Sequence, residues 1–88
     1  MRQLVYDENV SKVEEKELKD LFASKFGQYV RGLRKNKGLT QEELAHKANL
    51  HSTYIGHIET GTYTPSIFVV WKIAEVLKIS LSEFFKNF

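Results

Sequence analysis

The chain has 88 residues, enough for one small domain with a modest hydrophobic core. Apolar residues make up 42% of it and charged residues 27%, a balance typical of a globular protein rather than a disordered one. The absence of cysteine excludes a disulfide framework and a thiolate metal site, and the apolar segments are too short to span a bilayer. Because the N-terminus also lacks the apolar stretch of a signal peptide, we expect a cytoplasmic protein.

The net charge of +2 is unevenly distributed along the chain. Residues 1–21 have an excess of acidic side chains, whereas residues 22–88 have an excess of basic ones. Residues 22–38 carry five basic side chains and no acidic one, an asymmetry that suits phosphate binding. The same side chains also suit an ordinary solvated helix whose C-terminal end attracts cations. Charge therefore leaves both interpretations open.

We divide the chain into an N-terminal extension, residues 1–21, and a domain, residues 22–88. Residues 1–10 lack a helical period and are expected to form an arm or an extended segment. Ser11 followed by Glu14 suits a capping box, so the extension also contains the start of a helix.

Apolar residues recur at three- and four-residue steps between about residues 12 and 36, which predicts one helix or two. A break near Ser24 or Gly27 is the two-helix alternative. Gly38 is expected to follow this segment in the left-handed conformation that commonly ends a helix.

The start of the next helix is strongly specified. Thr40 is expected to be its N-cap, with Glu43 as the reciprocal partner of a capping box. Leu39 can pack against Leu44 across this cap, and Asn49 suits a turn at a positive φ angle. These features predict a short second helix that ends in a tight turn.

Three further helices are predicted in the C-terminal half. The third covers residues 52 to about 59 and is ended by Gly61. Ser66 caps a fourth helix up to about residue 78, and Ser80 with Glu83 forms a capping box for a short fifth helix. Since no convincing strand pattern or repeat is present, we predict an all-α bundle of five helices, or six if the extension adds one.

The predicted fourth helix is unusually apolar, with nine apolar residues among the eleven from Ile67 to Leu77. A helix that is apolar nearly all round is buried on more than one side. One side can face the core of the domain, so we predict that another faces a second copy; a very hydrophobic monomer core is the alternative. The expected dimer interface consists of Phe68, Val69, Trp71, Phe84, Phe85 and Phe88.

Several sequence blocks occur in one order between residues 24 and 86: Val30-Arg31-Gly32-Leu33-Arg34-Lys35, Gly38-Leu39-Thr40-Gln41-Glu42-Glu43-Leu44-Ala45, Tyr54-Ile55-Gly56-His57-Ile58-Glu59-Thr60-Gly61, Pro65-Ser66 and Lys72-Ile73-Ala74. With these blocks, residues 24–86 resemble the lambda-repressor-like helix-turn-helix regulators, also called the Cro-type or xenobiotic-response-element family. The stretch from Leu50 to Ile55 looks particularly like restriction–modification controller proteins. Two positions depart from that subfamily, which often has an arginine in place of Ser52 and a serine in place of Gly56.

The resemblance implies that the third helix enters the major groove of DNA. Hydroxyl groups can donate to or accept from several bases, and Thr53 also offers a methyl group to thymine. This face has no arginine or glutamine that could read a base through two hydrogen bonds, so we expect modest base discrimination and more weight on DNA shape. Helix capping is the alternative role of Ser52 and Thr53. The candidate base-reading residues are His51, Ser52, Thr53, Gly56 and His57.

Phosphate contacts are expected around this helix. Gln41 stands at the N-terminus of the second helix, where backbone N–H groups also face the ligand. Arg34 either contacts phosphate or, as the resemblance implies, pairs with Glu59 and braces the recognition helix. Tyr54 either packs in the core or places its hydroxyl on DNA. The candidate phosphate-binding residues are Gln41, Arg34, Lys35, Lys37, Tyr54 and Tyr63.

Other chemistry finds little support. The spacing of His46, His51 and His57 does not suit a metal site, and no nucleophile–base pair or paired carboxylates are apparent. We expect no enzyme activity, no cofactor, no small-molecule ligand and no membrane contact.

The sequence therefore predicts a homodimeric transcription regulator that binds double-stranded DNA at a pseudo-palindromic operator, with a restriction–modification controller as its most specific form. The alternative is an antitoxin-type interaction module whose residues 1–21 bind a partner protein.

Overall fold

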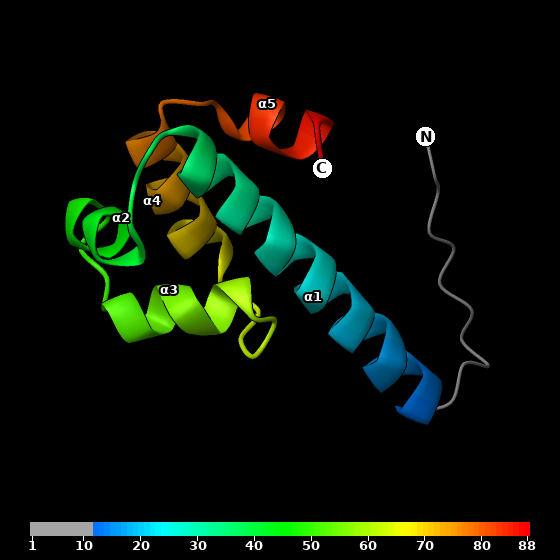
Figure 1. The fold of residues 1–88 in the computed structure, drawn as a ribbon. Coiled ribbons are helices and arrows are strands. Elements are labelled where there is room, and N and C mark those ends of the chain that lie inside the picture. Colours follow the sequence, from blue (N-terminus) through cyan, green and yellow to red (C-terminus); the bar gives the residue numbers. More distant parts are fainter. Residues whose placement is uncertain (1–11) are drawn as a thin grey trace.

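The structure is a computed structural model that describes residues 12–88, and within this range it contains five α-helices and no strand (Figure 1). The predicted all-α architecture is therefore confirmed for this part of the chain. The predicted arm over residues 1–10 and the cap at Ser11 lie outside the described residues. The helices are α1 (Lys12–Asn36), α2 (Gln41–Lys47), α3 (Ser52–Glu59), α4 (Ile67–Leu77) and α5 (Leu81–Lys86).

The first helix, α1, is continuous over 25 residues, so the alternative of a break near Ser24 or Gly27 is wrong. The boundary that we placed between residues 21 and 22 lies inside this helix. Gly27 has a different role: a Cβ atom there would overlap the carbonyl oxygen of Ile58 and would lie 2.6 Å from that of Glu59. Glycine thus lets the backbone of α1 approach that of α3 closely.

The hydrophobic core lies between α1 and the other four helices. From α1, the rings of Phe26 and Tyr29 pack against Phe84 of α5 at centroid distances of 5.8 and 5.1 Å. Tyr29 also donates a hydrogen bond from its hydroxyl group to the carbonyl oxygen of Phe84. Each large apolar side chain buried in this way stabilises the fold by about 1.5–3 kcal/mol. The largest fully buried side chains are Phe84, Leu44, Ile55, Ile58, Ile73, Leu77 and Val30.

Because Phe84 is completely buried within one copy of the chain, its predicted place at a dimer interface is wrong. Its side chain faces α1, whereas the neighbouring Phe85 is 42% exposed.

Local sequence signals place the helix ends. In the capping box of α2, the Thr40 hydroxyl accepts from the backbone N–H of Glu43 at 3.0 Å, and the Glu43 carboxylate accepts from that of Thr40 at 2.9 Å. These bonds hold the pKa of Glu43 below its usual value. Ser66 and Ser80 cap α4 and α5 by accepting from the N–H groups three residues later. The predicted N-caps of α2, α4 and α5 are therefore confirmed, and the capping box is complete at α2, whereas at α5 the structure shows its Ser80 half.

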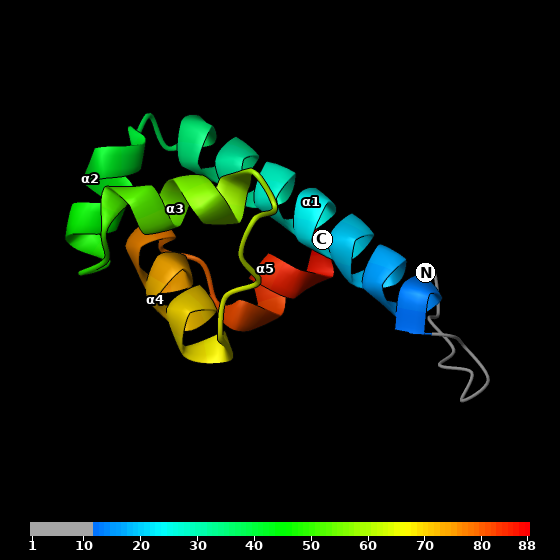
Figure 2. The same cartoon turned by 90° about the horizontal axis from the view of Figure 1, so that it is seen from below.

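Left-handed residues separate the helices, as predicted for Gly38 and Asn49, whose φ angles are 70° and 54°. Gly61, predicted to end the third helix, has a φ angle of 79°. Lys78 also adopts this conformation, with a φ angle of 59°, and ends α4 one residue earlier than expected. The resulting turns bring α2 and α3 together. Seen from below, α3 comes to the front of the molecule and α2 lies at one end of it (Figure 2).

Candidate nucleic-acid interface

Two short helices, α2 and α3, form a pair joined by a tight turn. Their inner faces are held by buried Leu44 and Ala45 from α2 and by Ile55 and Ile58 from α3. The turn is closed by a hydrogen bond of 2.8 Å from the N–H of Leu50 to the carbonyl oxygen of Ala45. Since the apolar side of α3 faces the core, its polar side faces outward.

An open hollow of about 720 Å³ lies along this outer side of α3. Four of the five predicted base readers, Ser52, Thr53, Gly56 and His57, line it. The fifth, His51, is the N-cap residue of α3 and lines a separate, smaller hollow with Ser52. The remaining lining residues of the larger hollow are Gln41, Glu42, Thr60 and Thr62.

Sequence reasoning missed Glu42 and Thr60 as part of this surface. The hydroxyl oxygens of Thr60 and Thr62 are 2.9 Å apart at the C-terminal end of α3. Hydroxyl residues directly after the predicted third helix were the available signal. Glu42 brings a negative charge to the hollow, which opposes the approach of phosphate.

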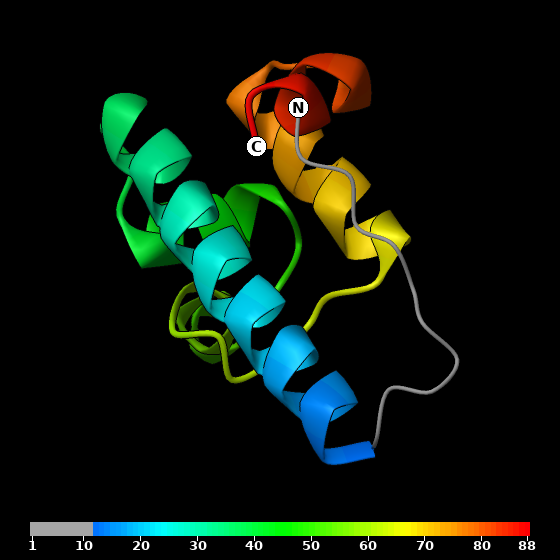
Figure 3. The same ribbon diagram turned by 90° about the vertical axis from the view of Figure 1, so that its right-hand side faces the viewer.

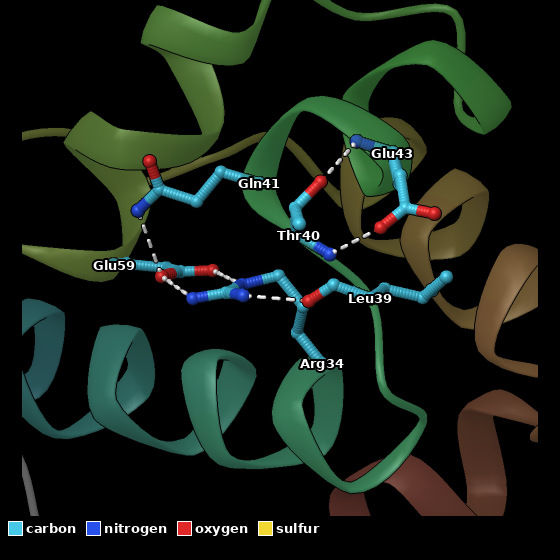
Figure 4. Close-up of polar contacts among 6 residues, drawn as sticks. All are labelled: Arg34, Leu39, Thr40, Gln41, Glu43 and Glu59. Carbon is cyan, nitrogen blue, oxygen red and sulfur yellow. Dashed lines mark hydrogen bonds and ion pairs between the residues drawn. The ribbon is translucent and has the colours of Figure 1, made fainter.

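Arg34 and Glu59 form a buried ion pair between α1 and α3 (Figure 4). The Arg34 Nε atom donates to Glu59 Oε2 at 2.7 Å, and Nη2 donates to Oε1 at 3.0 Å. A third donor, Nη1, bonds to the carbonyl oxygen of Leu39 at 2.7 Å. Hydrogen bonding to Glu59 raises the pKa of Arg34. With 8% of Arg34 exposed, this side chain braces α3 from inside, and its predicted contact with phosphate is wrong.

Gln41 joins the same carboxylate from α2. Its Nε2 atom donates to Glu59 Oε1 at 3.1 Å, so side chains from α1, α2 and α3 meet at one buried group. In Figure 4 the amide oxygen of Gln41 points away from Glu59. A Cβ atom at Gly56 would lie 3.6 Å from this oxygen, an ordinary contact. Glu59 thus fixes the orientation of a polar side chain at the edge of the hollow.

The predicted basic residues do not all gather here. Lys35 is exposed on the last turn of α1. Lys37 instead lines a different hollow of about 290 Å³ together with Lys47 and Lys78, beside the C-terminal end of α4. The structure therefore separates Lys37 from the outer face of α3.

The rings of the two predicted tyrosines pack together beside α3, with Tyr54 on its first turn and Tyr63 in the loop that follows it. The ring of Tyr63 is 5.7 Å from that of Tyr54 and 4.7 Å from that of His57, measured between centroids. Both tyrosines line a hollow of about 430 Å³ that reaches Lys16 and Lys19 on α1. Tyr54 is partly buried against the core, whereas Tyr63 is 47% exposed.

The described residues also bear on a metal site and on a membrane-spanning helix. Among residues 12–88, no group of three histidine, cysteine, aspartate or glutamate side chains is placed to hold a metal ion. No helix in the same range is long and apolar enough to cross a membrane.

Comparison with known proteins matches residues 30–84 to a helix-turn-helix family. Control protein C.BamHI of Bacillus amyloliquefaciens is 44% identical over 55 residues, which cover 61% of this chain and 68% of that protein. The immunity repressor protein of Bacillus phage phi105 is 41% identical over 56 residues, or 64% of this chain. The match spans 39% of the repressor, less than half of its length.

Solved structures of restriction–modification controller proteins also match this chain. The restriction–modification controller protein C.AhdI from Aeromonas hydrophila superposes with a TM-score of 0.70 at 39% identity, covering 73% of this chain and 97% of that one. The controller protein C.Esp1396I, crystallised as a tetramer with its natural 35-base-pair operator, gives a TM-score of 0.69 at 37% identity, with 74% and 86% covered. The matched helices include the pair formed by α2 and α3, and the chain belongs to the helix-turn-helix family.

Proposed function

We propose that the protein is a sequence-specific DNA-binding regulator of transcription. The observation that carries this proposal is the outer face of α3, where Ser52, Thr53 and His57 line an open hollow next to Gln41 of α2. This face is polar and open to solvent, as suits a helix that enters the major groove. It supplies hydroxyl groups and a methyl group at the positions where base edges would stand.

In this mechanism the buried ion pair sets the angle of the reading helix. Arg34 and Glu59 tie α3 to α1, and Glu59 holds the amide of Gln41 at the end of α2. The second N–H of the Gln41 side-chain amide and the ammonium group of Lys35 then donate to the phosphate backbone, which orients α3 without reading sequence. Ser52 and Thr53 contact bases, with His51 beside them at the N-cap.

We further propose that the protein acts in the cytoplasm as the controller of a restriction–modification locus. The similarity to C.BamHI and C.AhdI, both named as control proteins, supports this assignment. Whether bound protein blocks or recruits polymerase is set by the position of the operator relative to the promoter.

The proposed regulator is a homodimer on a pseudo-palindromic operator. The exposed apolar side chains of α4 and α5 support a second copy at this surface, because a monomer gains nothing from leaving them in water. The tetramer that C.Esp1396I forms on its operator is consistent with pairing of such domains. The proposed contact residues are Phe68, Val69, Trp71, Phe85 and Phe88.

Two substitutions test the division between phosphate and base contacts. Lys35→Ala should weaken binding to all duplexes alike and reduce the slope of log affinity against log salt by about 1. Thr53→Ala should change the preferred sequence, with a loss of about 0.5–1.5 kcal/mol on the best site, the contribution of one hydrogen bond. Both effects are measured by fluorescence anisotropy with labelled duplexes at several salt concentrations.

The controls are Lys25→Ala, an exposed lysine elsewhere on α1, and Ser82→Ala, an exposed hydroxyl on α5. Neither should alter affinity or preference. If Thr53→Ala leaves both unchanged, the assignment of α3 as the reading helix is wrong.

A further inference from the structure

The N-terminal half of α1 carries an apolar stripe that the domain core leaves exposed. Leu21 and Phe22 follow Leu18 by three and four residues, so all three lie on one side of the helix. Their exposed fractions are 43, 52 and 45%. This part of α1 precedes the residues matched by the family, which begin at residue 30. The stripe therefore lies outside the residues matched by the family.

The stripe continues into the apolar surface of the domain. The ring of Phe22 stacks on that of Phe26 at 5.9 Å and meets that of Phe88 edge-on at 5.6 Å. Phe22 also lines an apolar hollow of about 270 Å³ with Ile67 of α4 and Phe85 of α5. Figure 3 shows α1 on one side of the molecule and α4 with α5 on the other. The hollow thus connects the stripe to both C-terminal helices.

Next to this hollow, α4 presents three large side chains to solvent. Ile67 and Phe68 are 65 and 62% exposed, and Trp71 is 46% exposed, with its ring 6.2 Å from that of Phe68. We call the surface formed by Leu18, Leu21, Phe22, Ile67, Phe68 and Trp71 the apolar face.

The exposed rings of Phe85 in α5 and of Phe88 just after it add to the apolar face. Together these side chains offer on the order of 800 Å² of apolar surface, since a large side chain contributes roughly 200 Å² when fully exposed. A stable protein interface takes about 800 Å² from each partner. The largest apolar patch on a monomer is typically about 300–600 Å². The area therefore fits a partner of interface size.

We propose that a second copy of the chain covers the apolar face and that the N-terminal half of α1 packs across the two-fold axis on α4 of the other protomer. The inference rests on the proposed dimeric regulator and adds an element to its interface. The face combines protruding rings at Phe68 and Trp71 with a hollow large enough for an aromatic side chain, the self-complementarity that a two-fold contact requires.

This contact would give the N-terminal half of α1 a role in the dimer interface. The last helix, α5, has six residues, and the ring of Phe84 is buried in the core. From this helix, Phe85 remains available to a partner, with 42% of the residue exposed. The stripe on α1 widens the interface beyond α4 and α5 and fixes the distance between the two copies of α3.

Sedimentation equilibrium of the full chain tests the proposal. The variant Leu18→Ala/Leu21→Ala removes apolar area and keeps good helix formers, so the fold is retained. Its dimer dissociation constant should rise about 10-fold or more. The matched control Asp20→Ala/Arg31→Ala replaces two exposed residues on another side of α1, keeps the net charge, and should leave the constant unchanged. Equal constants for the wild type and the leucine variant would overturn the proposal.

A fluorophore placed on Leu21→Cys gives an independent readout, because the chain has no other cysteine. Its emission should shift to the blue as the concentration rises through the dimerisation range, whereas a label on Arg31→Cys should not respond. An apolar environment at Leu21 already in the monomer would mean that the chain's own N-terminal residues cover the stripe, which overturns the proposal.

The two proposals fail separately. A wild-type chain that is monomeric at every concentration overturns the proposed dimer as well as this contact. A wild-type dimer that Trp71→Ala weakens but Leu18→Ala/Leu21→Ala does not leaves the proposed function intact and removes α1 from the interface.

Discussion

At the scale of single residues, the carboxylate of Glu59 organises the reading surface from inside the domain. It accepts two hydrogen bonds from Arg34 and one from Gln41, and 5% of Glu59 is exposed. Burying a charged pair has little net benefit over apolar packing, but breaking such a pair leaves one charge without its partner. The pair therefore serves orientation of α3 more than overall stability.

Arg34→Ala should lower the free energy of unfolding by about 3–5 kcal/mol, since Glu59 would remain buried and unpaired. Urea denaturation measures this change. The adjacent Lys35→Ala is the control, and it should stay within about 0.5 kcal/mol of the wild type because Lys35 is exposed. A loss below about 1 kcal/mol for Arg34→Ala would show that the pair is not what holds α1 to α3.

Among the residues that line the hollow, Glu42 carries a negative charge that repels the phosphates of DNA. Its carboxylate stands where phosphate would approach, whereas Glu59 is neutralised by Arg34. Glu42→Gln should raise DNA affinity by about 3-fold at low salt, with the gain shrinking as salt screens the charge. Glu75→Gln, an exposed substitution on α4, is the control for net charge. A Glu42→Gln variant that binds more weakly would place this carboxylate in a direct base contact instead.

At the scale of helices, the crossing of α1 and α3 depends on a glycine. Gly27→Ala would place a Cβ atom on the carbonyl oxygen of Ile58, so it should destabilise the fold by about 1–3 kcal/mol or more. Gly32→Ala meets nothing within 4 Å and should stabilise it by about 0.5–1 kcal/mol through helix propensity. Thermal unfolding compares the two. Equal effects of the same sign would contradict the close crossing.

Helix ends were predictable from the sequence because they depend on neighbouring residues. The capping box at Thr40 and Glu43 and the left-handed turn at Gly38 follow from spacing alone. The continuity of α1 was not predictable in the same way. Ser24 and Gly27 resemble helix breakers, and it is the packing of α3 against Gly27 that gives this glycine another role.

The candidate site was predictable in part for the same reason. Residues on the outer side of α3 follow from helical spacing once its inner side is known. The pairing of Arg34 with Glu59 joins residues 25 positions apart, so the sequence left two roles open. Phe84 and Phe85 are identical in type, and the packing of α5 on α1 decides which of them is buried.

At the scale of the whole molecule, two surfaces differ in character and in the partner that they suit. The outer face of α3 is polar and suits DNA, whereas the exposed side of α4 and α5 is apolar and suits a second copy. Two recognition helices related by a two-fold axis would then contact half-sites about one helical turn, or about 34 Å, apart. The central claim is that this arrangement reads DNA sequence.

Selection of bound duplexes from a random pool by the full chain shows whether the protein reads sequence, because sequence preference and half-site spacing appear in one result. We expect enrichment of a two-fold-symmetric sequence whose half-site centres are about 10–10.5 base pairs apart. Recovery of a pool with no enriched sequence, or of a single unpaired half-site, would show that the dimer does not read DNA in this way.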